Sequence, residues 1–145
     1  KIDHEWEYIH DDIGYNLRLP SLNAALGLAQ ISEINNFLSL KRKLFFKYNR
    51  ILNKIEGIKL FKENKYSKSN YWLQTLILDN KNIPSKNKLI KASHNKNFYM
   101  RPAWKLISDL SPYKKKQRMN LEGAREIYKR AINLPSSQSL ISKIK

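Results

Sequence analysis

The chain has 145 residues and contains no cysteine. That length suits one domain with a buried core, and the composition excludes disulfides and thiolate zinc sites. No apolar run reaches the roughly 18 residues that a membrane span requires, and no basic-then-apolar leader is present, so we expect a cytoplasmic protein without membrane contact. The formal net charge of +16 makes a small basic nucleic-acid-binding α+β module the alternative. Because the lysines are scattered among asparagines and isoleucines, we do not expect nucleic acid as the partner.

The first elements are an arm and a long helix. Residues 1–19 show no helical period and predict an extended arm with a short strand near Trp6 and Tyr8. Pro20 suits the first turn of a helix, and apolar residues then recur at helical spacing. We therefore predict one long connecting helix over 20–56, bent near Asn35–Asn36 and ended by Gly57.

Residues 57–145 predict a small α+β domain. The expected elements are a strand over 71–78, a helix over 84–95, a short strand over 98–100, an irregular loop over 103–119, a helix over 122–130 and a strand over 131–134. The predicted fold class is thus α+β, with a long N-terminal helix followed by a small sheet flanked by helices.

Two places concentrate residues suited to bind an anion. Tyr15, Asn16 and Arg18 lie on a turn just before the long helix, where amide and guanidinium donors fit a phosphate or carboxylate. Arg101 ends a predicted strand and precedes Pro102, which stiffens the chain. Simpler interpretations stay open: Asn16 could only shape an Asx-turn, and Arg101 could form an ordinary salt bridge or stack on Trp104.

No metal site is expected. The cluster His4, His10, Asp11 and Asp12 lies on the arm without the spacing of a zinc site. Four scattered glycines cannot build a phosphate-binding loop, and there is no nucleophile elbow.

Four segments in order resemble one family. Gly14–Arg18 with Leu22–Gly27 is similar to a GYNxR…NAALG signature; the later segments are Tyr71–Trp72, Met100–Trp104 and Ile132–Ser137. Together they resemble the DegT/DnrJ/StrS sugar aminotransferases, which use pyridoxal 5′-phosphate (PLP). The opening HEWEYIHDDIGYN is most similar to the subgroup that aminates UDP-linked 4-keto-6-deoxy sugars in bacillosamine or legionaminic acid synthesis. Leu17 stands where the family often has an aromatic residue.

The resemblance implies a function and a domain organisation. It implies transfer of an amino group from glutamate to a nucleotide-activated keto-deoxy sugar in surface-polysaccharide or glycan biosynthesis. The division would be an arm over 1–19 that contributes to a shared active site, a connecting helix over 20–56, and a domain over 57–145 similar to the C-terminal small domain of fold-type I (aspartate aminotransferase-like) PLP enzymes. No lysine here matches the family's Schiff-base motif, so we expect that catalytic lysine upstream of this chain and no activity from this part alone.

The resemblance also assigns roles to the candidate residues. Asn16 would bind the phosphate of PLP in the neighbouring subunit of a homodimer. Arg18 would contact the substrate at the same shared site, with Tyr15 as a weaker substrate-binding candidate. Arg101 would line the entrance for the nucleotide sugar.

Overall fold

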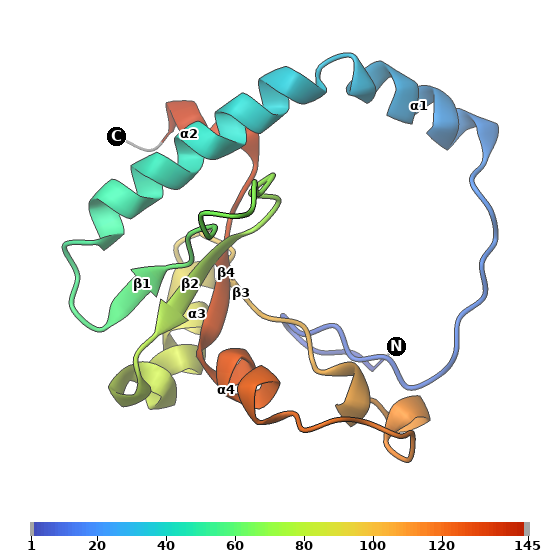
Figure 1. The fold of residues 1–145 in the computed structure, drawn as a ribbon, viewed down its shortest axis with the longest axis vertical. Helices are drawn as coiled ribbons and strands as arrows, with labels where there is room; N and C mark the ends of the chain where they lie inside the picture. The colour runs from blue at the N-terminus through green and yellow to red at the C-terminus, as the bar shows by residue number, and fades with distance from the viewer. Residues whose placement is uncertain (1, 144–145) are drawn as a thin grey trace.

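A computed structural model describes residues 2–143 of the chain. It is an α+β structure whose helices are α1 (Ser21–Ile31), α2 (Ile34–Leu52), α3 (Lys86–His94) and α4 (Glu122–Arg130). Its strands are β1 (Ile58–Leu60), β2 (Gln74–Leu78), β3 (Arg101–Pro102) and β4 (Ala131–Leu134). In the described part of the chain, these strands form one antiparallel sheet in the order β1-β2-β4-β3. Figure 1 shows α2 running over the sheet, while α1 and the segment just before it extend away from the sheet and the first residues of the arm return to it.

The core lies between the sheet and the helices α2 and α3. In β2, the side chains alternate between buried and half-buried, and the inward residues Leu76 and Leu78 face helix residues such as Tyr48 and Ile90. The core residues with almost no exposure are Leu44, Phe45, Leu60, Leu78, Ile90 and Ile132. The other face of the sheet carries the half-buried residues of β2 and β4.

The predicted helix over 20–56 is instead two helices, which corrects the sequence-based expectation. The break lies at Ser32–Glu33, just before the predicted bend at Asn35–Asn36. Ser32 Oγ donates to the carbonyl of Ala29 at 2.8 Å, and the Glu33 amide donates to the carbonyl of Gln30 at 3.1 Å. These tightened bonds end α1, and the Phe37 amide, which donates to the Glu33 carbonyl, begins the next turn. α2 then ends at Leu52, before Gly57.

The C-terminal half follows the predicted order with four differences. α4 and β4 have the predicted bounds, but β2 begins at Gln74, and a 3₁₀ helix over Asn80–Ser85 precedes α3. The short strand in this part is Arg101–Pro102 rather than 98–100, and β1 was not predicted. β1 has only three residues, so it offers too short a pattern to recognise. In the arm, Ile2 pairs with Ile9 in an isolated bridge, where a short strand was expected.

α1 buries none of its side chains in this chain. Leu22, Leu26, Leu28 and Ile31 are all more than 60% exposed. A helix that is apolar and uncovered needs another surface to pack against. Among residues 2–143, no helix is both long and apolar enough to span a membrane.

An ion pair fixes the loop that leads from β1 to β2. The guanidinium of Arg42, on α2, donates to both carboxylate oxygens of Glu63 and, at 2.8 Å, to the carbonyl of Ser69. Glu63 also accepts from the Ser69 amide at 2.5 Å. Arg42 lies 5.0 Å from the centre of the Tyr71 ring, so one side chain holds both ends of this loop against α2.

Acidification should release this loop. The hydrogen bond from Arg42, followed by that from the Ser69 amide, holds the pKa of Glu63 below its ordinary value of 4.5. A depressed folded-state pKa stabilises the fold above the ordinary value, and that contribution is lost as the pH falls through the lowered pKa. We therefore expect the difference in free energy of unfolding between the wild type and Glu63→Gln to shrink below about pH 4.5. Urea unfolding of both proteins from pH 7 to pH 3 measures this difference. A difference that does not change with pH would contradict a lowered pKa of Glu63.

Candidate functional site

The turn before α1 presents amide and guanidinium donors to solvent. Asn16 Oδ1 accepts a hydrogen bond from the Arg18 amide at 2.9 Å, which is the Asx-type contact considered from the sequence. This bond fixes the side-chain oxygen inward on the turn and leaves the Asn16 amide NH₂ as a donor. Arg18 has a φ of 69°, so the turn holds it in the left-handed region. Within residues 2–143, its guanidinium has no hydrogen-bond or ion-pair partner.

Arg101 lies in a row of polar residues across the outer face of the sheet. Arg101 on β3 is the register partner of Asn133 on β4, and Asn133 is the partner of Thr75 on β2. Thr75 Oγ1 donates to Asn133 Oδ1 at 2.9 Å. The Arg101 guanidinium lies 5.3 Å from the ring centre of Tyr8, from the arm. The structure therefore gives Arg101 an aromatic partner, which is Tyr8 rather than the Trp104 considered from the sequence.

Next to Arg101, the structure brings together two tryptophans that sequence reasoning did not choose as site residues. The rings of Trp72 and Trp104 stack with centres 5.6 Å apart and planes 27° apart. They are 60% and 53% exposed. Trp104 lines a small hollow of about 80 Å³ together with Arg101, Tyr8 and Asn133. Each tryptophan lies in a segment that carried the family resemblance, which is the only signal that could have found them.

Lys41 adds a positive charge behind this pair. From α2, its Nζ donates to the carbonyls of Trp72 at 3.1 Å and Ser136 at 2.5 Å. In the described part of the chain, it has no carboxylate partner. Burial lowers the pKa of this ammonium group.

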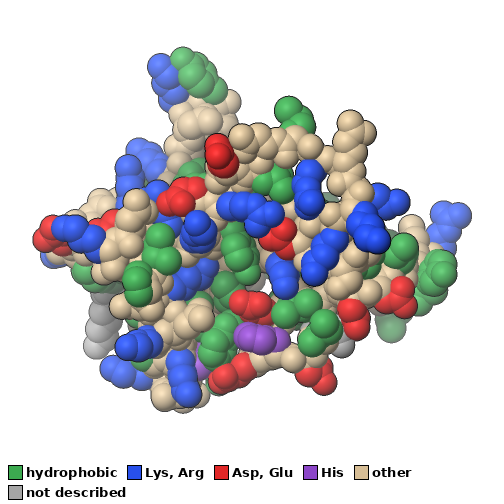
Figure 2. Space-filling model, turned by 90° about the horizontal axis from the view of Figure 1, so that it is seen from below, with side chains coloured by type: hydrophobic (Ala, Val, Ile, Leu, Met, Phe, Trp, Pro, Cys, Tyr) green, Lys and Arg blue, Asp and Glu red, His purple; other side chains and the backbone are tan. Residues whose placement is uncertain are grey.

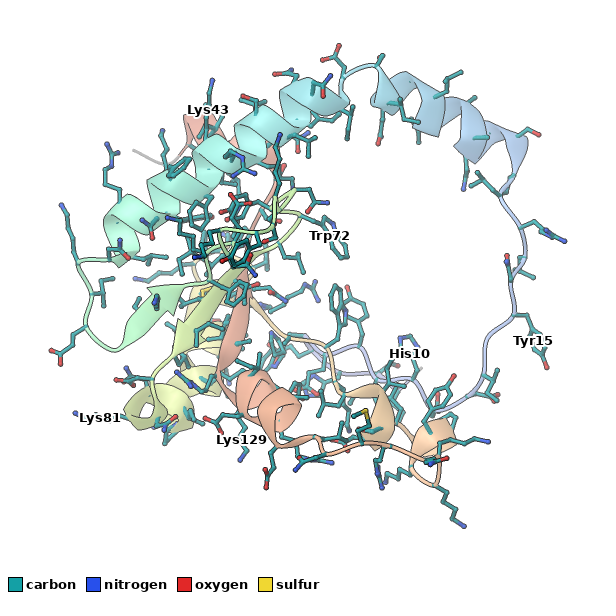
Figure 3. The ribbon with its side chains drawn as sticks, viewed as in Figure 1. His10, Tyr15, Lys43, Trp72, Lys81 and Lys129 are labelled. Carbon is teal, nitrogen blue, oxygen red and sulfur yellow. The ribbon has the colours of Figure 1, made fainter. Side chains whose placement is uncertain are left out.

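The chain does not bring its two groups of predicted site residues together. Figure 3 shows Trp72 directed from the sheet towards the side where the arm and α1 lie, while Tyr15 points outward from the segment before α1. Tyr15, Asn16 and Arg18 thus form one exposed turn, and Arg101 belongs to the sheet-face group. In the described part of the chain, residues 14–18 are exposed and lie outside the hollow that Arg101 lines.

Neither the charge pattern on the face in Figure 2 nor metal-binding side chains among residues 2–143 indicate a second site. On the face in Figure 2, lysines and arginines are interspersed with acidic and hydrophobic side chains and form no continuous basic surface. Within residues 2–143, no three His, Asp or Glu side chains converge in a group that could hold a metal ion.

Comparison with solved structures defines the fold class. PseC of Helicobacter pylori, an aminotransferase involved in the biosynthesis of pseudoaminic acid, superposes with a TM-score of 0.74 at 21% identity. The match covers 99% of this chain and 40% of that chain. The fold is therefore that of part of an aminotransferase of fold type I.

Sequence comparison identifies the family. Residues 1–143 match the DegT/DnrJ/EryC1/StrS aminotransferase family, and the chain belongs to it. The GDP-perosamine synthase of Escherichia coli O157:H7 is 30% identical over 92% of this chain. The UDP-4-amino-4,6-dideoxy-N-acetyl-β-L-altrosamine transaminase of Campylobacter jejuni is 24% identical over 93% of this chain. The chain spans 35–36% of the length of these two relatives.

Proposed function

We propose that this chain is the C-terminal part of a PLP-dependent aminotransferase that moves an amino group from glutamate to the keto carbon of a nucleotide-linked deoxy sugar. Membership of the family over residues 1–143 is the observation that carries the proposal. The names of two relatives supply the substrate class, since one is a GDP-sugar enzyme and the other a UDP-sugar enzyme.

The donors of the turn before α1 fit the phosphate of PLP. The Asn16 amide has its oxygen occupied by the Arg18 backbone, so its NH₂ group is the end offered to an acceptor. Phosphate oxygens accept hydrogen bonds, and a donor that its own turn already orients loses less conformational freedom when it binds them. We assign Asn16 to the cofactor phosphate and Arg18 to the substrate, with Tyr15 beside them.

Bound PLP would supply the electron sink for amino-group transfer. The residues of this chain would do the binding and orientation: Asn16 would hold the phosphate end of the cofactor. Arg18 and Arg101 would hold anionic groups of the substrate. The lysine that reacts with the cofactor belongs, in this proposal, to a part of the protein outside this chain, so the chain alone would be inactive.

The uncovered α1 supports a site shared between subunits. Its exposed leucines require a covering surface, and the turn 14–18 immediately precedes it. In a homodimer packed through this helix, the turn would reach the active site of the partner subunit.

The activity can be tested with the complete protein that contains this chain. Incubated with PLP, glutamate and a UDP- or GDP-linked 4-keto-6-deoxy sugar, it should form 2-oxoglutarate and an amino sugar in equal amounts, both measured by chromatography. The matched sugar nucleotide without a keto group should give neither product. The absence of 2-oxoglutarate with both keto-sugar nucleotides would overturn the proposal.

A further inference from the structure

The stacked pair Trp72–Trp104 has features of a prepared binding surface rather than of incidental surface residues. Two large aromatic rings more than half exposed are costly to leave in water unless something covers them. They come from segments 32 positions apart in the chain and meet only because β2, β4 and β3 are neighbours in the sheet. Within residues 2–143, neither indole N–H donates a hydrogen bond, so both N–H groups could donate to a ligand.

The backbone of Trp72 is held at both of its polar atoms by side chains. Its amide donates to Asn70 Oδ1 at 2.9 Å. Its carbonyl accepts from Ser136 Oγ at 2.7 Å and from Lys41 Nζ at 3.1 Å. The preceding residue, Tyr71, has a φ of 46°, in the left-handed region, and its ring stacks on the buried Phe45. The backbone that carries the Trp72 ring is therefore fixed before any ligand arrives, and the ring itself stacks on Trp104.

Positive charge lies beside the pair in the hollow that Trp104 lines. Arg101 belongs to this hollow, whereas the Lys41 ammonium group lies behind Trp72 and donates to the carbonyls of Trp72 and Ser136. A flat aromatic surface beside a guanidinium matches a ligand with a flat ring joined to an anionic group. A nucleoside diphosphate has that chemistry, and base stacking tolerates any base because each has a π-face.

We propose that Trp72 and Trp104 form the surface on which the base of the nucleotide substrate stacks, with Arg101 facing its diphosphate. This inference rests on the proposed function for the identity of the substrate. It adds the residues that would bind the nucleotide, and it places them on the sheet face, apart from the turn 14–18.

The test measures dissociation constants of UDP, GDP and inorganic pyrophosphate by calorimetry on the complete protein loaded with PLP. Trp72→Ala and Trp104→Ala should each raise the Kd for UDP and GDP about ten-fold, as expected for loss of a base–aromatic stack. Pyrophosphate has no ring, so its Kd should change less than two-fold. Trp104→Phe, which keeps an aromatic face, should restore most of the affinity. Phe61→Ala, which removes another exposed ring, is the matched control and should bind all three like the wild type.

The outcomes separate this inference from the proposed function. Equal UDP affinity in the wild type and the alanine variants overturns the inference, as does an equal loss for UDP and pyrophosphate, which would indicate a disturbed fold. Failure of the wild type to bind UDP and GDP also overturns it. Conversion of glutamate to 2-oxoglutarate is assayed in parallel on the wild type. Ring-dependent nucleotide binding without that conversion would support the inference while contradicting the aminotransferase proposal.

Discussion

Asn16→Asp should weaken retention of PLP by the complete protein more than Asn16→Ala does. The aspartate keeps an oxygen that can accept from the Arg18 amide, so the turn is preserved. It removes the NH₂ donor, however, and places a negative charge beside the phosphate. Loss of one hydrogen bond to a charged group corresponds to about a ten-fold higher Kd for Asn16→Ala, and like-charge repulsion adds to this in Asn16→Asp. Equilibrium dialysis followed by absorbance of the bound cofactor measures both constants.

Which of the two variants has the higher Kd for PLP distinguishes the two interpretations of Asn16. If Asn16 only shapes the turn, Asn16→Asp should retain PLP like the wild type, and Asn16→Ala should be the weaker binder. Arg18→Ala serves as the companion variant, since we expect it to raise the KM for the nucleotide sugar while PLP retention stays close to that of the wild type. Leu17→Ala, an exposed neighbour on the same turn, is the control for disturbance of the backbone.

Local sequence signals predicted the elements whose boundaries are set locally. The bounds of α4 and β4 follow from helical periodicity that ends where β-favouring residues begin at Ala131. The break between α1 and α2 was misplaced because it has neither glycine nor proline. It depends on a hydrogen bond from the Ser32 hydroxyl to a carbonyl one turn earlier. A serine within a helical pattern can continue the helix or end it, so the sequence alone does not predict the break.

Candidate site residues could be predicted from the sequence only where their contacts are to neighbours in the chain. The exposed donors at Asn16 and Arg18 could be predicted because the bond that shapes this turn joins residues only two positions apart. The pairing of Trp72 with Trp104 could not, because it depends on the strand order β2-β4-β3 and on register. The partner of Arg101 was also missed, since Tyr8 reaches it from the distant arm.

Phe45→Ala should destabilise the sheet domain by about 3–5 kcal/mol, the usual cost of removing a buried aromatic ring. Phe45 is 1% exposed, and its ring stacks on Tyr71 with centres 4.3 Å apart. The adjacent Phe46 is 57% exposed and is the matched control, since the same substitution one position along α2 removes little buried area. We expect about 1 kcal/mol or less for Phe46→Ala. Hydrogen exchange at the amides of β2 and β4 reports the local free energy of opening without requiring that the whole protein unfold in one step.

The substitution at Phe45 should also act on the nucleotide surface. Tyr71 keeps a left-handed backbone at a cost of about 1–3 kcal/mol, which persists only while its surroundings enforce it. Without the Phe45 ring, the stacking contact of Tyr71 is lost, while the Arg42 guanidinium over the ring and the bond from the Tyr71 amide to Ser69 Oγ remain. Trp72 is the next residue in the chain, so relaxation of the Tyr71 backbone should turn the Trp72 ring away from Trp104. The Kd for UDP should therefore rise in Phe45→Ala but not in Phe46→Ala. Equal destabilisation by the two variants, or unchanged UDP binding in Phe45→Ala, would show that the core does not position this pair.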